Sequence, residues 1–533
     1  MTLSWARRVV PSWDLARSNP RHFATQSGEA SAQATVSTAT EAARISKAVS
    51  EFEAHPTLGL ASDVLRFSNM VGVADGRLDS AAAYVLKQTA SVPEGLYRTA
   101  DSVLRKVKGS LPSVEMDFDA GETVALSIRR LRAWLRIYNR DGLAWSDLAR
   151  SLAANGNNEG ARRAITTALF INPNSRLVLR NATRFHLHNK DPERALHLLH
   201  HHERTKTDPW LMAGHIAISS IVGKESKLLK RGRHLIEAKR LTAADATELA
   251  SSIATLELQS GATRVAKKLF NISLVSPNQN TLAQIEWASN QLKLVPDLPV
   301  HWLNFPDSAE AGYYRAIFDG DFSTALTRAI GWCQYEPFAS RPLIAASFLS
   351  SMQGDHHSAV EYAKKGLATE PQDITLLNNL LFAVANDSAA YDLDSLVHQI
   401  WSLERKEPDP QTLANFGMLA YLSGELQKGS MLYEAAWTQS RRKNLHEQAA
   451  NILSFQAHFS DLAGSPDATT IKARAASAVK ATALPLSDAV FKHLFLSIAE
   501  RDVKPASRTK LSAAWNYDAA SNTLTFDKRI PIK

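Results

Sequence analysis

Apolar and small residues recur along the middle of this chain with the spacing of amphipathic helices. Between residues 142 and 209, two consecutive blocks of 34 residues can be superimposed without a gap. In the first block the recurring positions are Trp145, Leu148, Ala149 and Leu152, then Gly156, then Ala161, Ile165, Ala168 and Pro173. Two apolar stripes at helical spacing, separated by a glycine and closed by a proline, predict two helices joined by a tight turn.

The same pattern returns downstream. The second block is less regular, because His186 and His202 replace apolar or small residues. The later copies contain Ala250, Ile253, Ala254, Gly261, Ala266, Phe270 and Pro277; Ala316, Gly320, Ala325, Ala329, Trp332 and Pro337; Leu343, Ala346, Ser347, Gly354, Ala359, Ala363 and Pro371; and Leu413, Phe416, Gly417, Gly424, Gly429, Tyr433 and Ala436. Small residues let antiparallel helices approach closely, and stacked pairs bury their apolar faces against each other. The sequence therefore predicts an all-α solenoid of antiparallel helix pairs.

This pattern resembles the tetratricopeptide repeat, in which an aromatic residue, Leu, Gly and Tyr are followed by Ala, Phe, Ala and Pro. The resemblance covers residues 142 to 443, with a divergent unit near 210 to 243. It implies a superhelix whose first helices line a concave groove. It also implies a non-catalytic scaffold that holds a partner protein or peptide in that groove.

Breaks in the pattern predict the domain organisation. Pro296, Pro299 and Pro306 cannot continue a helix, so they mark a joint between two arrays. Alternation of Trp515 and Tyr517 with Leu524 and Phe526 predicts a small C-terminal β-hairpin. The expected segments are a disordered basic tail at 1-40, a helical region at 41-141, TPR-like array I at 142-291, the Pro-rich joint at 292-306, TPR-like array II at 307-443, capping helices at 444-505, and a tail with the hairpin at 506-533. Within the capping segment, helices are expected near 445 to 463 and 487 to 500.

Composition and charge bear on the partners and on the cellular compartment of the protein. The chain has 533 residues and a formal net charge of +8, which favours acidic partners. Charges interrupt every apolar stretch before the roughly 18 residues that a membrane helix needs, so no membrane span is expected. A single cysteine, Cys333, fits a reducing compartment, and we expect a cytoplasmic protein. The start of the chain leaves a mitochondrial alternative open, because its Arg/Ser-rich composition is that of a transit peptide, with Arg7, Arg8, Arg17 and Arg21.

No motif for catalysis or for a cofactor stands out. His446 and Glu447 begin an HExxH pattern, but Ala450 occupies the position of its second histidine. His197 and His201 share a helix face at the spacing of a metal-ligand pair, yet no carboxylate or cysteine completes a ligand set, so they are read as part of a polar face. We therefore expect no enzyme, no metal and no cofactor.

Partner-binding residues are expected on the groove side of the first helices. On the N-terminal array, forked hydrogen bonds from arginines suit carboxylates or phosphates, while the same arginines could instead form surface ion pairs. On the C-terminal array, amides suit an extended backbone and aromatic residues suit side chains, while the amides could instead bond within the solenoid. The predicted partner-binding residues are Arg150, Arg180, Asn181, Arg184, Asn378, Asn379, Phe382, Asn415, Met418 and Tyr421.

Two basic helices support an alternative function. The helices at 129-140 and 224-240 keep their leucines on one face and their cations on the other, so the protein could be an RNA-associated or organelle-targeted repeat protein. The residues are Lys224, Lys227, Lys230, Arg231 and Arg233, together with Arg129, Arg130, Arg132, Arg136 and Arg140. A solvated polar face explains the same pattern, and no stacking aromatic accompanies the second helix.

Overall fold

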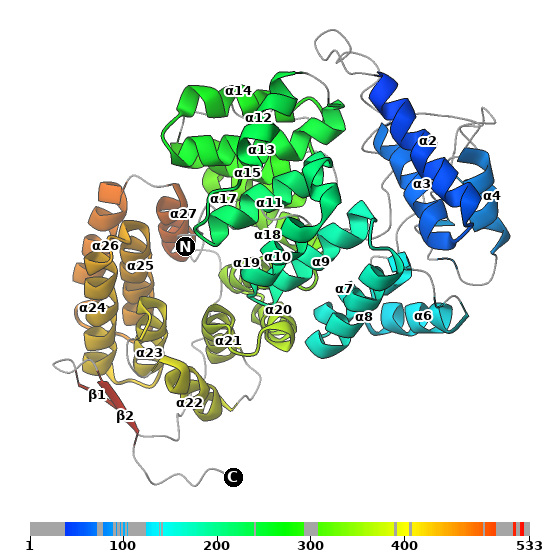
Figure 1. The fold of residues 1–533 in the computed structure, drawn as a ribbon. Coiled ribbons are helices and arrows are strands. Elements are labelled where there is room, and N and C mark those ends of the chain that lie inside the picture. Colours follow the sequence, from blue (N-terminus) through cyan, green and yellow to red (C-terminus); the bar gives the residue numbers. More distant parts are fainter. Residues whose placement is uncertain are drawn as a thin grey trace. The chain divides into compact units, whose positions relative to one another are not determined.

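The computed structural model describes most of the chain as helices (Figure 1). The described residues are 38–71, 78–88, 92, 96–97, 100–101, 104, 124–137, 139, 142–238, 241–292, 308–387, 392–404, 408–482, 485–496, 515–518 and 523–526. The chain divides into two compact units, Met1–Ala311 (unit 1) and Gly312–Lys533 (unit 2). Among the described residues, no helix has the length and apolar character that crossing a membrane requires.

Unit 1 consists of helices that follow one another as antiparallel neighbours. They are α2 (Thr38–Ala54), α3 (Leu58–Val71), α4 (Asp79–Lys87), α6 (Val124–Ile137), α7 (Gly142–Ala154), α8 (Asn158–Ile171), α9 (Arg176–His188), α10 (Pro192–His201), the 3₁₀ helix η4 (Glu203–Lys206), α11 (Pro209–Ile221), α12 (Leu229–Glu237), α13 (Ala243–Gln259), α14 (Thr263–Ser273) and α15 (Gln279–Leu292). Successive helices such as α7 and α8, α9 and α10, and α13 and α14 pack on each other.

Unit 2 repeats this arrangement. The helix α17 (Ala309–Asp319) contains the boundary between the units. It is followed by α18 (Phe322–Tyr335), α19 (Ser340–Met352), α20 (His356–Thr369), α21 (Ile374–Asn386), α22 (Leu393–Glu404), α23 (Pro410–Leu422), α24 (Leu426–Arg442), α25 (His446–Leu462), α26 (Ala468–Thr482) and α27 (Pro485–Leu496). The strands β1 (Trp515–Asp518) and β2 (Thr523–Phe526) pair antiparallel, with Trp515 opposite Phe526 and Tyr517 opposite Leu524.

A recurring turn separates the two helices of several pairs. Its key residue has a positive φ, which glycine adopts without steric cost. Gly156, Gly320 and Gly354 take this role, with φ values of 74°, 75° and 80°. The next residue is an N-cap for the second helix, since the Asp355 carboxylate accepts a hydrogen bond from the backbone N–H of Ser358. This Gly-Asp or Gly-Asn step explains why the turn can be recognised in the sequence.

Close approach of the paired helices requires the small residues of the repeat. In α23, a Cβ atom at Gly417 would lie 2.7 Å from the Tyr433 ring of α24, so only glycine fits there. Tyr433 is fully buried in the apolar core of unit 2, beside Leu413 and Phe416. The core of unit 1 is built in the same way from α11, α13, α14 and α15.

The structure confirms the predicted fold class. It is an all-α array of antiparallel helix pairs with a small C-terminal hairpin. Helices α25 and α27 lie where terminal helices were expected, and α26 between them was not predicted. Apart from residue 292, the predicted Pro-rich joint at 292-306 lies outside the described residues, as does nearly all of the tail at 1-40. The predicted domain boundaries stay predictions.

Candidate partner-binding surfaces

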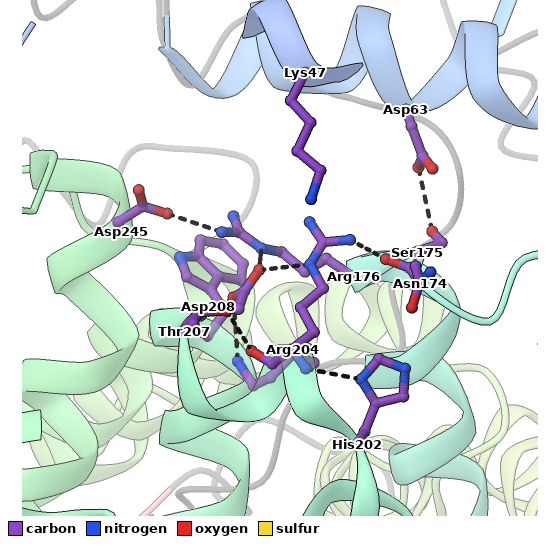
Figure 2. A network of polar contacts seen from close by, with 12 residues as sticks. Lys47, Asp63, Asn174, Ser175, Arg176, His202, Arg204, Thr207, Asp208 and Asp245 are labelled. Carbon is purple, nitrogen blue, oxygen red and sulfur yellow. Dashed lines mark hydrogen bonds and ion pairs between the residues drawn. The ribbon is translucent and has the colours of Figure 1, made fainter. Parts of the chain in front are cut away.

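Two arginines of α9 form buried ion pairs with helices further along unit 1. The Arg180 Nη2 donates a hydrogen bond of 2.6 Å to the Glu248 Oε1 of α13. The Arg176 Nε donates to the Asp208 Oδ2, the N-cap of α11, at 2.6 Å, and its Nη2 donates to the Asp245 Oδ1 of α13 at 3.1 Å (Figure 2). These contacts connect the first helices of three successive pairs, α9, α11 and α13.

The network is shielded from solvent. Arg180 is 1% exposed and Arg176 is 5% exposed. The Trp210 ring lies under both guanidinium groups, with its centroid 4.2 Å from the Arg180 Cζ and 5.6 Å from the Arg176 Cζ. Burial opposes the charge of Arg176, but the carboxylates of Asp208 and Asp245 outweigh it and raise its pKa. The positive charges of this face are therefore neutralised within the protein.

One edge of the network joins the start of α9 to η4. The Arg204 Nε lies 3.3 Å from the Asp208 carboxylate, and its Nη1 donates to the Asn174 carbonyl (Figure 2). The His202 Nδ1 accepts a hydrogen bond of 3.2 Å from the backbone N–H of Arg204. The proton of that ring must then be on Nε2, which donates to the Pro173 carbonyl at 2.9 Å. These contacts hold the loop before α9 against the loop before α11.

The predicted N-terminal groove residues lie on α7 and α9. Arg150, Arg180 and Asn181 are buried, and Arg184 is half-buried. The Asn181 Nδ2 donates a hydrogen bond of 2.8 Å to the Ser146 Oγ of α7, which connects two neighbouring first helices. The ion pair of Arg180 with Glu248 is buried, whereas the alternative left open by the sequence was an ion pair at the surface. A role of these residues in partner binding stays a prediction.

The predicted amides of unit 2 also bond within the solenoid. The Asn378 Nδ2 donates a hydrogen bond of 2.7 Å to the Thr412 Oγ1, and the Asn378 Oδ1 accepts one of 3.0 Å from the Asn415 Nδ2. The Asn379 Nδ2 donates to the Ile344 carbonyl at 3.1 Å. The amides thus connect α21 to α19 on one side and to α23 on the other.

The three apolar or aromatic residues predicted for the same face contribute to packing in unit 2. Met418 is fully buried and Tyr421 is 2% exposed. The half-buried Phe382 ring meets two rings of α25, with centroid distances of 5.7 Å to Phe455 and 5.9 Å to Phe459. Since α23 lies between α21 and α25 in the chain, these rings connect alternate first helices of unit 2.

The cations of the predicted basic helix α12 and of the residues just before it are all exposed. We call this surface the basic stripe; its residues are Lys224, Lys227, Lys230, Arg231 and Arg233. On the opposite face of α12, Ile236 is buried with the core of unit 1, as the sequence pattern indicates. Arg233 forms an ion pair with Glu257 of α13.

A second set of exposed cations lies on α6. Arg129, Arg130, Arg132 and Arg136 are exposed, while Leu131 and Leu135 on the other face are buried. The predicted fifth residue of this set, Arg140, lies outside the described residues.

The histidine-rich segment contributes an inter-helix contact that the sequence did not indicate. The His200 Nδ1 of α10 lies 3.4 Å from the His215 Nε2 of α11, and the two rings stack. The His215 Nδ1 lies 2.9 Å from the Ser226 Oγ. Burial, and then the neighbouring His200, lower the pKa of His215 to about 4, so this imidazole is neutral.

The single thiol is also kept in its neutral form. Burial raises the pKa of Cys333 to about 12, which suppresses the nucleophilic thiolate. The side chain packs with the residues of α17, α18 and α19, in line with the apolar stripe on which it lies.

The carboxylates of the α9 network were missed by sequence reasoning. The sequence does contain a signal for these carboxylates, which is an opposite charge two repeats after each arginine. Arg176 and Asp245 are 69 residues apart, and Arg180 and Glu248 are 68 residues apart. A comparison of charges between alternate 34-residue blocks would have paired them. Reading each block separately could not.

Comparison with known proteins does not identify a family for this chain. No protein-family model matches the chain, and no curated protein matches it. Among solved structures, the human IFIT1 dimer with PPP-AAAA is 13% identical, and the match covers 82% of this chain and 100% of that chain with a TM-score of 0.29. Naa15/Naa10 bound to HypK-THB is 14% identical, with coverage of 88% and 85% and a TM-score of 0.19. Neither likeness supports an argument about this chain.

Proposed function

We propose that this chain is a non-catalytic helical-repeat scaffold that binds an acidic protein partner through the basic stripe. The observation that carries the proposal is a contrast in exposure. Arg176 and Arg180 are buried against carboxylates of their own unit, whereas the five cations of the stripe are all exposed. An acidic surface can approach Lys224, Lys227, Lys230 and Arg231 without breaking an ion pair like that of Arg180 and Glu248, while Arg233 is already paired with Glu257 of α13.

The position of the cations on α12 favours a binding role over a stabilising one. Lys230 and Arg231 lie in the first turn, where the helix dipole disfavours positive charge by about 0.3–1 kcal/mol for each residue. Leu228 at the N-cap offers no side-chain hydrogen bond to this end of the helix. An acidic partner at the same end would interact favourably with both the cationic side chains and the positive end of the helix dipole.

A peptide in the groove of unit 1 remains a further binding mode, as the TPR resemblance implies. It would have to compete with Glu248 for Arg180, because that guanidinium is already paired and buried. The cost of exposing a buried carboxylate makes this mode more demanding than binding at the stripe.

A second candidate function is the binding of nucleic acid. The exposed arginines of α6 favour it, because a second cationic helix would add contacts to phosphates. Against it, the segment 224–237 contains no tyrosine, phenylalanine or tryptophan on which bases could stack.

The test is affinity purification of partners with the full-length chain from its native cells, with and without nuclease. Two charge-reversal variants are compared, K227E/K230E/R231E on the stripe and R129E/R132E/R136E on α6. Each changes three exposed cations, so the change in net charge is matched. We expect a defined acidic protein to be recovered regardless of nuclease, lost with the stripe variant and retained with the α6 variant.

Two results contradict the proposal. Loss of all partners after nuclease treatment would assign the surface to nucleic acid, and equal loss with both variants would mean that only the total charge matters. Salt provides a separate readout on the purified complex. Contacts to many phosphates make the affinity fall steeply as salt rises, while one acidic protein surface gives a shallower dependence.

A further inference from the structure

Two arginines at the edge of the α9 network share one carboxylate oxygen. The Arg176 Nε and the Arg204 Nε both lie against the Asp208 Oδ2, at 2.6 Å and 3.3 Å. The other oxygen of that carboxylate, Oδ1, accepts hydrogen bonds from the backbone N–H groups of Trp210 and Leu211 at the start of α11. Arg204 therefore has only a share in the negative charge of Asp208.

The Arg204 guanidinium also has donors that the protein does not use. Its Nη1 donates to the carbonyl of Asn174, which is a neutral acceptor, and its Nε is directed at Asp208. Within the described part of the chain, no group accepts a hydrogen bond from its Nη2. The side chain is 27% exposed, so an anion from the solvent can reach those two N–H groups.

A third cation approaches Arg204 from α2. Figure 2 shows the Lys47 side chain pointing from α2 toward the Arg204 guanidinium. The helix pair of α2 and α3 is held there in part by Asp63 of α3, whose Oδ1 accepts a hydrogen bond of 3.2 Å from the Ser175 Oγ. The ion pair of Lys47 with Glu51 on its own helix is 4.0 Å long and exposed, so it is weak. Two cations thus face each other without a strong counter-charge of their own.

We propose that Lys47 and Arg204 bind the phosphoryl group of a small phosphate between α2 and η4. Like charges that point at each other repel, and an anion between them turns that repulsion into two attractions. The oxygens of a tetrahedral phosphate point in several directions, so it can accept from an ammonium on one side and from the edge of a guanidinium on the other. The proposal is independent of the basic stripe, because no residue of the stripe takes part in it.

The experiment is isothermal titration calorimetry of inorganic phosphate into the full-length chain at constant ionic strength. K47A removes one of the two cations without disturbing a buried contact, since the Lys47 side chain is 79% exposed. K492A is the matched control, because Lys492 is another exposed lysine that is paired with an acidic residue four positions away. We expect K47A to weaken phosphate binding by at least about tenfold, the effect of losing one charge-assisted hydrogen bond. K492A should bind phosphate like the native chain.

Further titrations identify the source of the phosphoryl group. O-phosphoserine and a nucleoside 5′-monophosphate are compared with inorganic phosphate, and acetate is the planar anion for comparison. Similar affinities for the three phosphates support recognition of the phosphoryl group alone. Tighter binding of one of them also supports the proposal and identifies the molecule that carries the phosphate.

Three outcomes overturn the proposal. The first is a native chain that does not bind phosphate, and the second is equal binding by K47A and K492A, which would mean that phosphate associates with the protein without a site. The third is tighter binding of acetate than of phosphate. The stripe variant K227E/K230E/R231E should keep its phosphate binding, so a failure of this proposal and a failure of the proposed function can be told apart.

Discussion

Arg180 and Glu248 are 68 residues apart in the sequence, yet their side chains form an ion pair of 2.6 Å that is almost fully shielded from solvent. The pair connects α9 to α13, two first helices separated by another helix pair. A second contact of the same kind, between Phe382 and Phe455, connects α21 to α25 in unit 2. Contacts between alternate repeats constrain the curvature of an array. Contacts between neighbouring repeats alone would leave that curvature adjustable.

Removal of one partner from the Arg180 pair should be strongly destabilising. In E248A the guanidinium stays buried with its main counter-charge removed, so we expect the free energy of unfolding to fall by about 3–5 kcal/mol. Urea denaturation followed by tryptophan fluorescence measures this loss, since the centroid of the Trp210 ring lies 4.2 Å from the Arg180 Cζ. The double variant R180M/E248L should lose less than E248A. A loss of under about 1 kcal/mol in E248A would mean that Arg180 is hydrated in solution.

The amide contacts of unit 2 predict a smaller effect. N378A removes one hydrogen bond to the buried Thr412 hydroxyl and one from the Asn415 Nδ2, which keeps its bond to the Asn378 carbonyl. We expect a loss of about 0.5–1.5 kcal/mol, the usual net contribution of a hydrogen bond. Thermal unfolding checks this value, with S402A as the control because that hydroxyl is exposed. Equal melting temperatures for the two variants would contradict the prediction.

Gly417 offers a test of the helix packing. Alanine in a helix interior is favoured over glycine by up to about 1 kcal/mol. At this position, however, the added methyl group would meet the buried Tyr433 ring at 2.7 Å, and overpacking costs about 1–3 kcal/mol. We therefore expect G417A to be less stable than the native chain in urea denaturation. A more stable variant would show that α23 and α24 separate readily.

The buried His215 predicts a pH dependence of stability. Its pKa is about 4 in the folded protein, because of burial and of the nearby His200, against an ordinary value of 6.5. Between these two values the unfolded chain binds a proton that the folded chain does not bind, so stability falls as the pH decreases below 6.5 and is level above it.

The measurement compares the native chain with H215N from pH 7.5 to pH 5. We expect the native chain to lose more unfolding free energy than the variant over this range. His458, whose pKa burial also lowers to about 4, is present in both proteins, so its effect cancels in the difference. Parallel curves for the two proteins would show that His215 does not stay neutral in the folded state.

Local pattern accounts for most of the fold that could be predicted. The turns at Gly156, Gly320 and Gly354 were recognisable because a positive φ after a helix is nearly restricted to glycine. The helix α26 was missed because its many alanines give a weak contrast between its two faces. The exposure of the stripe cations followed from the apolar face of α12, since a helix that buries one side presents the other to solvent.

The binding residues were harder to predict than the helices. Arg180 and Asn378 were expected on the groove side of first helices, but both are buried, and their bonds with Glu248 and Thr412 were not foreseen. Whether a polar side chain on such a face is offered to a partner depends on what the next repeats bring against it. That information is distributed over about 70 residues of chain, beyond the reach of a single repeat unit.

The sequence by itself determined the type of structure, since the spacing of small and apolar residues and the glycine turns act within one helix pair and require antiparallel stacking. Only the tertiary structure decided which polar residues are exposed and available to a binding partner. The packing within each unit brings Arg180 against Glu248 and α27 against α18 and α19, and these are contacts between segments far apart in the chain. Burial and pairing depend on such long-range contacts, so they cannot be read from the local pattern that specifies the helices.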